Sequence, residues 1–356
     1  MTAPDPRTLP PPLRHRLARQ LRGMQDAPDP DLEEAGWLDA AGRFTPEAGS
    51  LFGVDIGGTK VQSVLTDLNG DVVADIRSET PSVGGDAVLD LLASHLSQMM
   101  KQTGAPLLAA GVGLPGAVHP VTGELDRAPN LSGLAGCDMR ALLTGRLGVP
   151  TAVENDVNFA ALGEVWLGHG TTSATMSGGL AFLALGTGIG MGLVWGDQIL
   201  RGALGAAGEA AALPIGANPF DPATHSCGAL ESVVSGAALV ADYRASGGLR
   251  FGQTLREITR DTSADPAMDA VMDRLAQRTA LAVLAIDAIV NPALFVFGGG
   301  IGSQPALLER VRTELARAMP HGMPVPDCRI SQLGNRAGVI GAIRAARLMF
   351  ADSLSK

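Results

Sequence analysis

The same short design occurs twice in this chain of 356 residues. In the first copy, the apolar run LFGVDI at residues 51–56 is followed by the glycine turn GGTK and the alternating run VQSVLTD. In the second copy, LAFLALG at residues 180–186 is followed by TGIG and MGLVWGDQIL. Asn69-Gly70 and Gly196-Asp197 mark hairpin turns after the two copies. An internal duplication of this kind predicts two related halves, each opened by a strand, a glycine turn and a second strand.

Helices and buried strands alternate through the rest of the chain, which predicts an α/β fold. The first half continues as an antiparallel meander of three strands that ends in VVADIR. We then expect a helix at residues 86–103, the strand LLAAGVGLP, a helix at 139–147, the strand TAVEN and the helix VNFAALGEVWLG. For the second half we expect helices at residues 228–245, 255–260 and 266–290, the strand ALFVFGGGIG and a last helix at 337–350.

Composition favours small-molecule partners. Hydrophobic residues make up 46% of the chain and charged residues 18%, with a net charge of −9, and the sequence pI is near 5.1. This acidic balance disfavours a protein that mainly binds nucleic acid or an anionic membrane. The three cysteines, Cys137, Cys227 and Cys328, lack metal-ligand spacing and are expected to be free thiols.

The chain shows no pattern that predicts export or membrane insertion. The uncharged run at residues 176–195 is rich in glycine, which favours strands over a membrane span. The first residues contain prolines and an Asp where a signal peptide needs an apolar core. We therefore expect a cytoplasmic protein without a membrane partner.

Residues 1–50 differ from the rest and are expected to form an N-terminal appendage with its own short helices. Leu13, Leu17 and Leu21 repeat at helical spacing, and an acidic, Pro-rich turn precedes the segment DLEEAGWLDAAGRF. This appendage carries six Lys and Arg against eight Asp and Glu, a net charge of −2. The other predicted domains are a first lobe at residues 51–165, completed by the helix at 337–350, and a second lobe at residues 166–336.

Three glycine turns are candidates for nucleotide contacts. Gly57 and Gly58 in DIGGTK, and Gly186 and Gly188 in LGTGIG, follow strands, so backbone N–H groups there can approach a phosphate without an intervening Cβ. Two such turns in duplicated halves suggest two loops that hold one polyphosphate, although structural hairpins would use the same glycines. The third turn, FGGGIG at residues 297–302, lacks the spacing of a dinucleotide fingerprint and is interpreted as a flat surface for a purine.

The segment Glu154-Asn155-Asp156 places two carboxylates and an amide at the end of a predicted strand. A carboxylate in that position can accept a hydroxyl proton as a general base, while Asn155 positions the hydroxyl. Asp156 also stands just before an apolar helical run, where it can serve instead as the N-cap. Glu209 in GALGAAGEAA and Glu231 in CGALES lie beside glycines and are either pocket acids or solvated side chains.

A series of segments in a fixed order carries a family resemblance. They are DIGGTK, GVGLPGAV, APNLSG, ENDVNFAALGE, LGTGIGMGLV, GALGAAGE, LESVVSG, VFGGGIG and LGNRAGVIGA. Over residues 51–348 the chain resembles the ROK family, which joins bacterial sugar kinases to sugar-responsive repressors. The resemblance implies an α/β, actin-like ATPase (RNase H-like) fold with two lobes and an interlobe cleft. It also implies ATP and Mg²⁺ as cofactors, a sugar substrate and a homodimer.

The resemblance also assigns roles to individual residues. Asp156 matches the catalytic base that takes a proton from a sugar hydroxyl, and Asp55 matches the residue that orients Mg²⁺ through water. The implied sugar-binding residues are Gly116, Asn130, Asn155, Glu209 and Glu231. The implied phosphate-binding residues are Gly57, Gly58, Thr59, Lys60, Gly186, Thr187 and Gly188, and Gly298, Gly299 and Gly300 are expected to border the adenine.

The sequence departs from the family at its usual zinc cassette. In the family, a GEIGH segment and a CxCGxxGCLE cassette supply one His and three Cys to a structural zinc, and the same His contacts the sugar. This chain has GEAAALPIG and THSCGALES instead, so Ala212 replaces the histidine and only His225 and Cys227 remain nearby. Because two ligands do not make a tetrahedral zinc site, we expect no structural zinc and no other metal-ligand cluster.

Three functions are compatible with these motifs. An ATP-dependent sugar kinase is favoured, because Asp156, both phosphate turns and two pocket acids are retained. A ROK-type sugar-responsive transcriptional regulator is the alternative, since DLEEAGWLDAAGRF resembles the end of a winged-helix domain and Arg14, Arg16, Arg19 and Arg22 lie on one short helix. The acidic appendage has too little sequence for a complete winged helix, which disfavours DNA binding. The third function is a sensor that binds sugar or nucleotide without catalysis.

Overall fold

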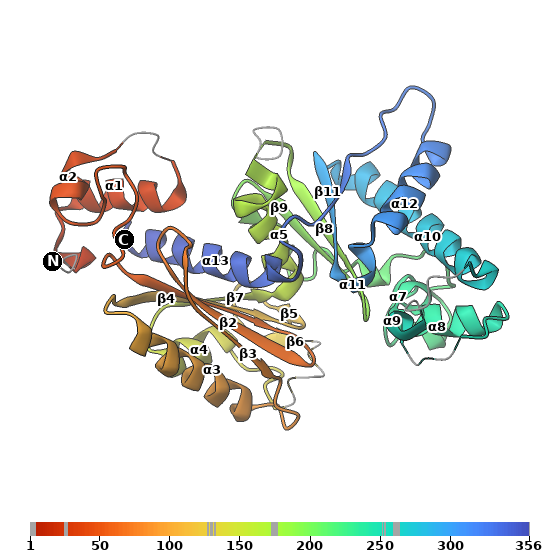
Figure 1. The fold of residues 1–356 in the computed structure, drawn as a ribbon, viewed down its shortest axis with the longest axis horizontal. Helices are drawn as coiled ribbons and strands as arrows, with labels where there is room; N and C mark the ends of the chain where they lie inside the picture. The colour runs from red at the N-terminus through yellow and green to blue at the C-terminus, as the bar shows by residue number, and fades with distance from the viewer. Residues whose placement is uncertain are drawn as a thin grey trace. The chain divides into compact units, whose positions relative to one another are not determined.

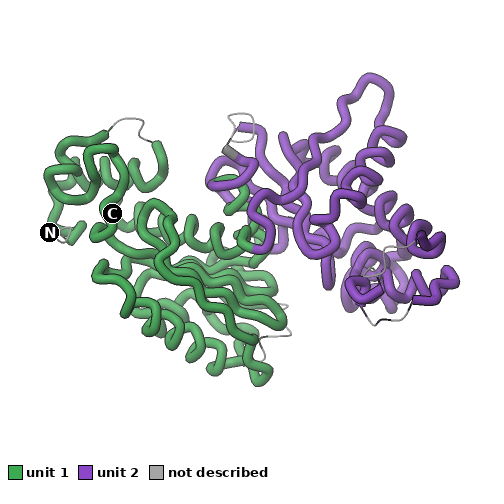
Figure 2. Tube along the Cα trace, in the orientation of Figure 1, with its two compact units in different colours: residues 1–166, 203–205, 336–356 green, residues 167–202, 206–335 purple. Residues whose placement is uncertain are grey.

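The computed structural model describes residues 5–24, 28–126, 128, 131, 133–171, 177–250, 252, 254–258 and 264–355. The chain divides into two compact units (Figure 2). Unit 1 consists of residues 1–166, 203–205 and 336–356, and unit 2 consists of residues 167–202 and 206–335. Unit 1 is therefore built from both ends of the chain.

A five-stranded sheet with the order β3-β2-β1-β4-β7 forms the centre of unit 1. Its strands are β1 (Ser50–Ile56), β2 (Lys60–Asp67), β3 (Val72–Glu79), β4 (Leu107–Leu114) and β7 (Thr151–Asn155). β1, β2 and β3 form the predicted antiparallel meander, whereas β1, β4 and β7 run parallel. The short strands β5 (Ala117–Val118) and β6 (Leu125–Asp126) pair in a separate sheet.

Helices cover both faces of this sheet (Figure 1). One face packs against α3 (Asp86–Met99) and α4 (Met139–Leu147), which bury Val88, Leu92 and Leu143 against the strands. The expected helix at residues 86–103 ends in a separate 3-10 turn, η2 (Met100–Gln102). On the opposite face lies α13 (Ala337–Ser353), and α5 (Asp156–Leu167) packs against it.

Two glycines allow α13 to pack unusually closely. A Cβ added to Gly111 of β4 would lie 2.0 Å from the carbonyl oxygen of Ala342. A Cβ added to Gly341 of α13 would lie 1.7 Å from the carbonyl oxygen of Phe159 in α5. Only glycine permits backbones to approach to this distance. These contacts place the start of α13 beside the carboxyl ends of the parallel strands.

The N-terminal segment shares the core of unit 1. It contains η1 (Pro6–Thr8), α1 (Pro11–Arg22) and α2 (Pro30–Glu34), and α1 lies alongside α13 (Figure 1). Leu17, Leu21 and Trp37 belong to one apolar cluster with Leu51 of β1 and Phe350 of α13. The short helices agree with the sequence analysis, but their buried side chains make the segment part of unit 1 rather than an appendage.

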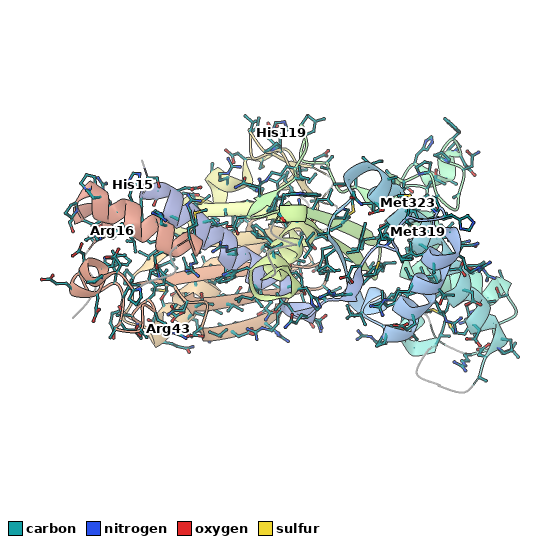
Figure 3. The ribbon with its side chains drawn as sticks, turned by 90° about the horizontal axis from the view of Figure 1, so that it is seen from above. His15, Arg16, Arg43, His119, Met319 and Met323 are labelled. Atoms are coloured by element: carbon teal, nitrogen blue, oxygen red, sulfur yellow. The ribbon has the colours of Figure 1, made fainter. Side chains whose placement is uncertain are left out.

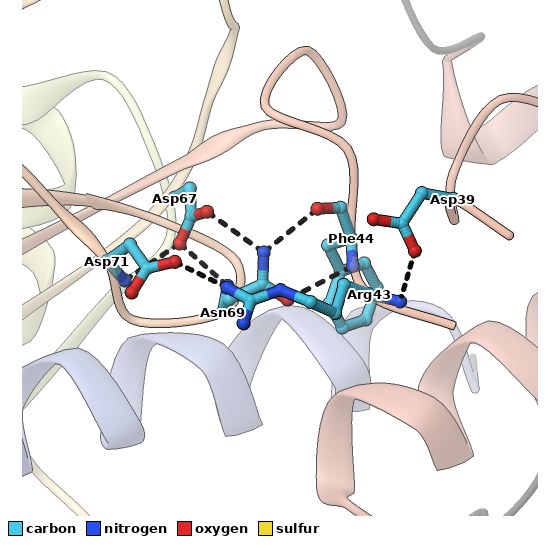
Figure 4. A network of polar contacts seen from close by, with 6 residues as sticks. All are labelled: Asp39, Arg43, Phe44, Asp67, Asn69 and Asp71. Atoms are coloured by element: carbon cyan, nitrogen blue, oxygen red, sulfur yellow. Dashed lines mark hydrogen bonds and ion pairs between the residues drawn. The ribbon is translucent and has the colours of Figure 1, made fainter. Parts of the chain in front are cut away.

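A polar network ties this segment to the turn between β2 and β3 (Figure 4). Asn69 in that turn accepts a hydrogen bond from the Phe44 N–H at 3.0 Å and donates one to the Phe44 carbonyl at 2.9 Å. Arg43 next to Phe44 forms an ion pair with Asp71. The Asn69-Gly70 turn therefore also docks the N-terminal segment, in addition to closing the hairpin.

Unit 2 repeats the sheet of unit 1. Its strands are β8 (Leu180–Leu185), β9 (Ile189–Trp195), β10 (Gln198–Ile199), β11 (Leu294–Gly298) and β12 (Cys328–Ile330). They lie in the order β10-β9-β8-β11-β12, with β8, β11 and β12 parallel. This matching order confirms the predicted duplication. The uncharged run forms strands as expected, and in the described parts of the chain no helix is long and apolar enough to cross a membrane.

The secondary structure of unit 2 differs from the expected elements at two places. The expected single helix at residues 228–245 is wrong, because extended Ser235 separates α7 (Glu231–Val234) from α8 (Gly236–Ala245) and caps α8 by accepting from the Ala238 N–H at 3.3 Å. The sequence analysis also omits β12 and α12 (Pro305–Ala318). The other helical elements are α9 (Leu255–Ile258), α10 (Pro266–Val290), α11 (Gly299–Gly302), η3 (His169–Thr171), η4 (Ala210–Ala212), η5 (Pro222–Thr224) and η6 (Gly334–Arg336).

Candidate active site

Asp55 and Asp156 lie at the same edge of the unit 1 sheet. Asp55 stands near the end of β1 and pairs in register with Gly113 of β4, which pairs in turn with Glu154 of β7. Asp156 follows β7 directly and begins α5. Because β1, β4 and β7 are parallel, their carboxyl ends meet at this edge, where α/β sheets commonly bind ligands.

Both carboxyl groups have raised pKa values. Burial raises the pKa of Asp55 to about 6. Burial and, secondarily, the nearby charge of Asp55 raise the pKa of Asp156 to about 7, although a hydrogen bond from the Val157 N–H opposes this shift. Asp156 therefore changes its protonation state close to neutral pH, which is the property that a general base needs at that pH.

The Asp55 carboxylate provides an oxygen site for a cation. It makes no hydrogen bond or ion pair with the residues that the structure describes, apart from the electrostatic contact with Asp156. A Cβ added to Gly338, in the first turn of α13, would lie 2.7 Å from its Oδ2 atom, so the carboxylate faces that helix start. An oxygen ligand without another partner suits a hard divalent cation such as Mg²⁺.

Asn155, rather than Asp156, is the main cap of α5. Its Oδ1 atom accepts from the Val157 N–H at 2.9 Å and from the Asn158 N–H at 3.2 Å, while its amide donates to the Gly116 carbonyl at 3.0 Å. Asp156 accepts from the adjacent Val157 N–H at 2.9 Å. Asn155 thus holds the start of α5 and the Gly116 loop together, whereas the sequence analysis offered Asp156 as the cap and gave Asn155 only the role of positioning the hydroxyl.

The turn between β1 and β2 uses one of its own N–H groups. The Gly57 N–H donates to the Lys60 carbonyl at 2.8 Å, and the Thr80 hydroxyl donates to the Gly57 carbonyl at 2.8 Å. Gly58, Thr59 and Lys60 are exposed. A phosphate contact at this turn would therefore fall to these three residues rather than to the N–H of Gly57.

Unit 2 contains an open pocket of about 520 Å³. Glycines, small polar side chains and apolar side chains line it, together with one Arg: Gly186, Thr187, Gly236, Ala237, Thr254, Leu255, Arg256, Gly300, Ile301 and Gln304. Two of the three expected adenine glycines do not line it. A Cβ on Gly298 would lie 2.2 Å from the Phe182 ring, and one on Gly299, which has a φ of +77°, would lie 2.4 Å from the Leu185 carbonyl oxygen. These two glycines pack against β8, and only Gly300 reaches the pocket.

Glu231 supports the second glycine turn. Its Oε2 atom accepts from the Ile189 N–H at 2.9 Å, and a Cβ added to Gly188 would lie 2.2 Å from the same oxygen. The Gly186 N–H donates across the turn to the Gly188 carbonyl at 2.9 Å, and the Gly236 N–H donates to the Gly186 carbonyl at 3.0 Å. One carboxylate oxygen of Glu231 is therefore engaged in holding the turn.

The remaining candidate residues are Glu209, Asn130 and the residues of the shortened cassette. Glu209 is exposed and precedes η4, and Asn130 lies outside the described residues. Ala212 and His225 are exposed and Cys227 is half-buried. No three His, Cys, Asp or Glu side chains of the described ranges gather in a metal-binding group, so the residues present do not fit a tetrahedral zinc, and the absence of zinc stays a prediction.

Comparison with known proteins decides the family. The family model of the ROK family matches residues 51–348. The chain belongs to the ROK family. A glucokinase of Streptomyces coelicolor is 29% identical over 318 residues, which cover 84% of this chain and 98% of the glucokinase. A putative xylose repressor of Caldicellulosiruptor sp. is 30% identical over 249 residues, which cover 68% of this chain and 60% of the repressor.

Solved structures of the family share the fold. A ROK hexokinase from Thermus thermophilus has 30% sequence identity and a TM-score of 0.70, covering 85% of this chain and 99% of the hexokinase. A ROK glucokinase from Streptomyces griseus, in complex with glucose and AMPPNP, has 26% identity and a TM-score of 0.69, covering 84% of this chain and 99% of the glucokinase. The predicted family and the actin-like ATPase (RNase H-like) fold are thus confirmed, and the family includes both kinases and repressors.

Proposed function

We propose that this ROK-family protein is an ATP-dependent sugar kinase. The observation that carries the proposal is Asp156, a carboxylate with a pKa raised to about 7 at the strand ends of unit 1. The kinase relatives support it as well, because the similarity spans 98% of the Streptomyces coelicolor glucokinase but only 60% of the xylose repressor.

In the proposed reaction, Asp156 acts in its carboxylate form. It accepts the proton of a sugar hydroxyl, and that oxygen attacks the γ-phosphorus of ATP while ADP leaves. Asn155 positions this base through the cap of α5 and holds the Gly116 loop. The family resemblance assigns the sugar contacts to Gly116, Asn130, Asn155, Glu209 and Glu231.

The nucleotide is assigned to the glycine turns and to the pocket of unit 2. Gly186, Thr187 and Gly300 line that pocket, where small residues leave room for a planar base and backbone groups can meet phosphates. Gly58, Thr59 and Lys60 offer further phosphate contacts in unit 1. Asp55 would orient Mg²⁺ through water, and the ion would neutralise charge on the transferred phosphoryl group when it is bound.

A sugar-responsive regulator remains the second candidate because repressors belong to the same family. Two of the four arginines of α1 (Figure 3 labels Arg16) argue against it. Arg16 pairs with Asp29 at 3.3 Å and also with Asp31, and Arg22 pairs with Asp352. Side chains that are already paired with carboxylates must break those pairs before they can contact DNA phosphates.

ADP release measured with Mg²⁺-ATP and a panel of hexoses, N-acetylhexosamines and cyclitols tests the proposal. We expect one sugar to stimulate ADP release well above the rate without sugar, and phosphorylated sugar to appear in equal amount. The absence of sugar-dependent ADP release across the panel would contradict the kinase. Nanomolar, sugar-sensitive binding to one promoter fragment at physiological salt would instead support the regulator. Sedimentation of the same sample tests the homodimer that we infer from the family.

A further inference from the structure

A cavity of about 610 Å³ lies within unit 1 at the edge opposite the candidate active site. Its walls come from the N-terminal segment, from residues 106–108 and 149–150 at the start of β4 and β7, and from the last turn of α13. Asp55 and Asp156 stand at the other ends of the same strands. The cavity is therefore separate from the residues of the proposed reaction.

Most of the cavity wall is apolar. Leu107, Leu108 and Leu354 line it together with Trp37 and Phe350, whose rings stack with centroids 6.4 Å apart. Known small-molecule sites combine such a wall with a few polar groups that orient the ligand, and their volumes range from roughly 300 to 1,000 Å³. In size and in lining, this cavity matches that description.

Two buried donors at this cavity lack an acceptor. Trp37 is fully buried, and its indole N–H has no hydrogen-bond partner among the described residues. The Nε of Arg14 is also buried without a partner there. A buried donor without an acceptor is unfavourable. Arg14 as a whole is half-buried. Both side chains line the cavity, but these two nitrogens are closed to solvent, so a ligand in the cavity would meet Arg14 at its terminal guanidinium nitrogens.

The charges around the cavity leave Arg14 as the unbalanced group. Asp5 and Arg7 also line the cavity, but they neutralise each other through hydrogen bonds of 2.8 to 3.1 Å. On the same helix as Arg14, Arg16 and Arg22 have carboxylate partners, whereas Arg14 forms no ion pair with any residue of the described ranges. The cavity therefore carries one uncompensated positive charge.

We propose that this cavity binds a small amphipathic carboxylate. Its carboxylate pairs with the terminal guanidinium nitrogens of Arg14, and its apolar body packs on the leucines and Phe350. A single free guanidinium and an apolar wall suit one negative charge on an apolar body better than a phosphate, which carries more charge and more acceptors. This site does not depend on the proposed kinase activity. The bound ligand would join the N-terminal segment, the sheet and α13, and so should stabilise unit 1.

Calorimetry and thermal unfolding of the full chain with four probes test the proposal. Sodium octanoate supplies both the anion and the apolar body, 1-octanol only the body, and sodium acetate and inorganic phosphate only the anion. We expect saturable binding of octanoate and a rise in Tm that grows with its concentration. Octanol should bind at least tenfold more weakly, and acetate and phosphate should not bind measurably.

Variants then assign the binding to Arg14. Arg14→Met should weaken octanoate binding at least tenfold without changing the weak binding of octanol, and should raise the Tm of the free protein because an unpaired cation is removed. Arg19→Met is the matched control on the exposed side of α1, and it should change neither the octanoate affinity nor the Tm. Equal octanoate affinity in Arg14→Met and the unmodified protein, equal binding of octanol and octanoate, or binding of phosphate alone would each overturn the proposal.

Discussion

The two sheets of this protein have the same strand order but different side chains at their carboxyl edges. In both, the first glycine of the turn after the opening strand donates its N–H across the turn, from Gly57 to Lys60 and from Gly186 to Gly188. In unit 1, Asp55 and Asp156 occupy the strand ends, whereas β8 of unit 2 ends at Leu185 and is followed by a pocket of small residues. One backbone design thus places two buried carboxyl groups at the strand ends of one unit and an open pocket of small residues in the other.

The sheets also differ in how their helices are held. In unit 1, Gly111 and Gly341 bring backbones into direct contact around α13. In unit 2, large buried side chains such as Val283, Val311 and Leu315 fill the space between helices and sheet. We therefore expect unit 1 to be destabilised by added side-chain volume at these glycines, and unit 2 by removed volume at these core positions.

The largest expected effect is on the kinetics of the proposed reaction, where variants of the two units should change different constants. Asp156→Asn in unit 1 should lower kcat for sugar-dependent ADP release by about 10² or more, the upper part of the usual range for a general base, and leave ATP binding unchanged. Thr187→Ala in the unit 2 pocket should instead raise KM for ATP several-fold while kcat is largely retained. Steady-state kinetics and calorimetry with ATP measure both. Turnover of Asp156→Asn near that of the unmodified protein would remove the base assignment.

The next largest expected effect is a loss of stability in variants that change the packing of each unit. Gly111→Ala should destabilise unit 1 by about 1–3 kcal/mol, because the added methyl group meets the backbone of Ala342. Leu315→Ala should destabilise unit 2 by about 2–5 kcal/mol through the opposite change, a cavity.

Denaturant unfolding of each variant measures these changes. Gly145→Ala is the control in unit 1, because no atom lies within 4 Å of its added Cβ, and it should leave stability unchanged or slightly higher. If Gly111→Ala were as stable as Gly145→Ala, the close backbone contact in unit 1 would not be a constraint.

The pH dependence should reveal the raised pKa of Asp156. Because the base must be ionised and burial raises its pKa to about 7, the proposed activity should fall about tenfold for each pH unit below about 7. An ordinary carboxyl would keep its activity down to about pH 4. A rate that is constant from pH 5 to pH 8 would contradict this assignment.

The raised pKa of Asp156 also makes the stability of the folded protein depend on pH. The Asp156 carboxyl has a pKa of about 7 in the folded protein and of 3.8 in the unfolded chain, so the folded protein binds this proton more tightly. The contribution of Asp156 to the free energy of unfolding is therefore lost as the pH rises from about 4 to about 7. Asp156→Asn cannot ionise, so its Tm relative to the unmodified protein should increase between pH 4 and pH 8. A constant difference in Tm over this range would contradict the raised pKa.

The smallest expected effect is that of a chelator on the Tm, because the zinc cassette of the family is shortened in unit 2. With Ala212, His225 and Cys227 in place of four ligands, the purified protein should contain no stoichiometric zinc and keep its Tm in chelator. Elemental analysis and unfolding with and without chelator measure this. One zinc per chain would show that the cassette binds metal through residues that the motif comparison does not identify.

Local patterns in the sequence determine much of the fold. The alternation and turn residues of residues 51–77 predict β1, β2 and β3, and Asp265 followed by Pro266 marks the start of α10. The ordered motifs predict the family and therefore Asp55, Asp156 and the two glycine turns. These features are readable because hairpin turns, helix periods and phosphate-binding glycines depend on residues that are adjacent in the chain.

Other features depend on residues that only the tertiary structure brings together. The N-terminal segment joins unit 1 because Leu17 and Trp37 pack against Phe350 at the far end of the chain. Gly298 and Gly299 serve packing because β8 lies beside β11, and the pKa of Asp156 is raised because burial and Asp55 surround it. Burial and charge proximity are properties of space rather than of sequence distance, so neither the positioning role of Asn155 nor the unpaired Arg14 could be inferred before the chain was folded.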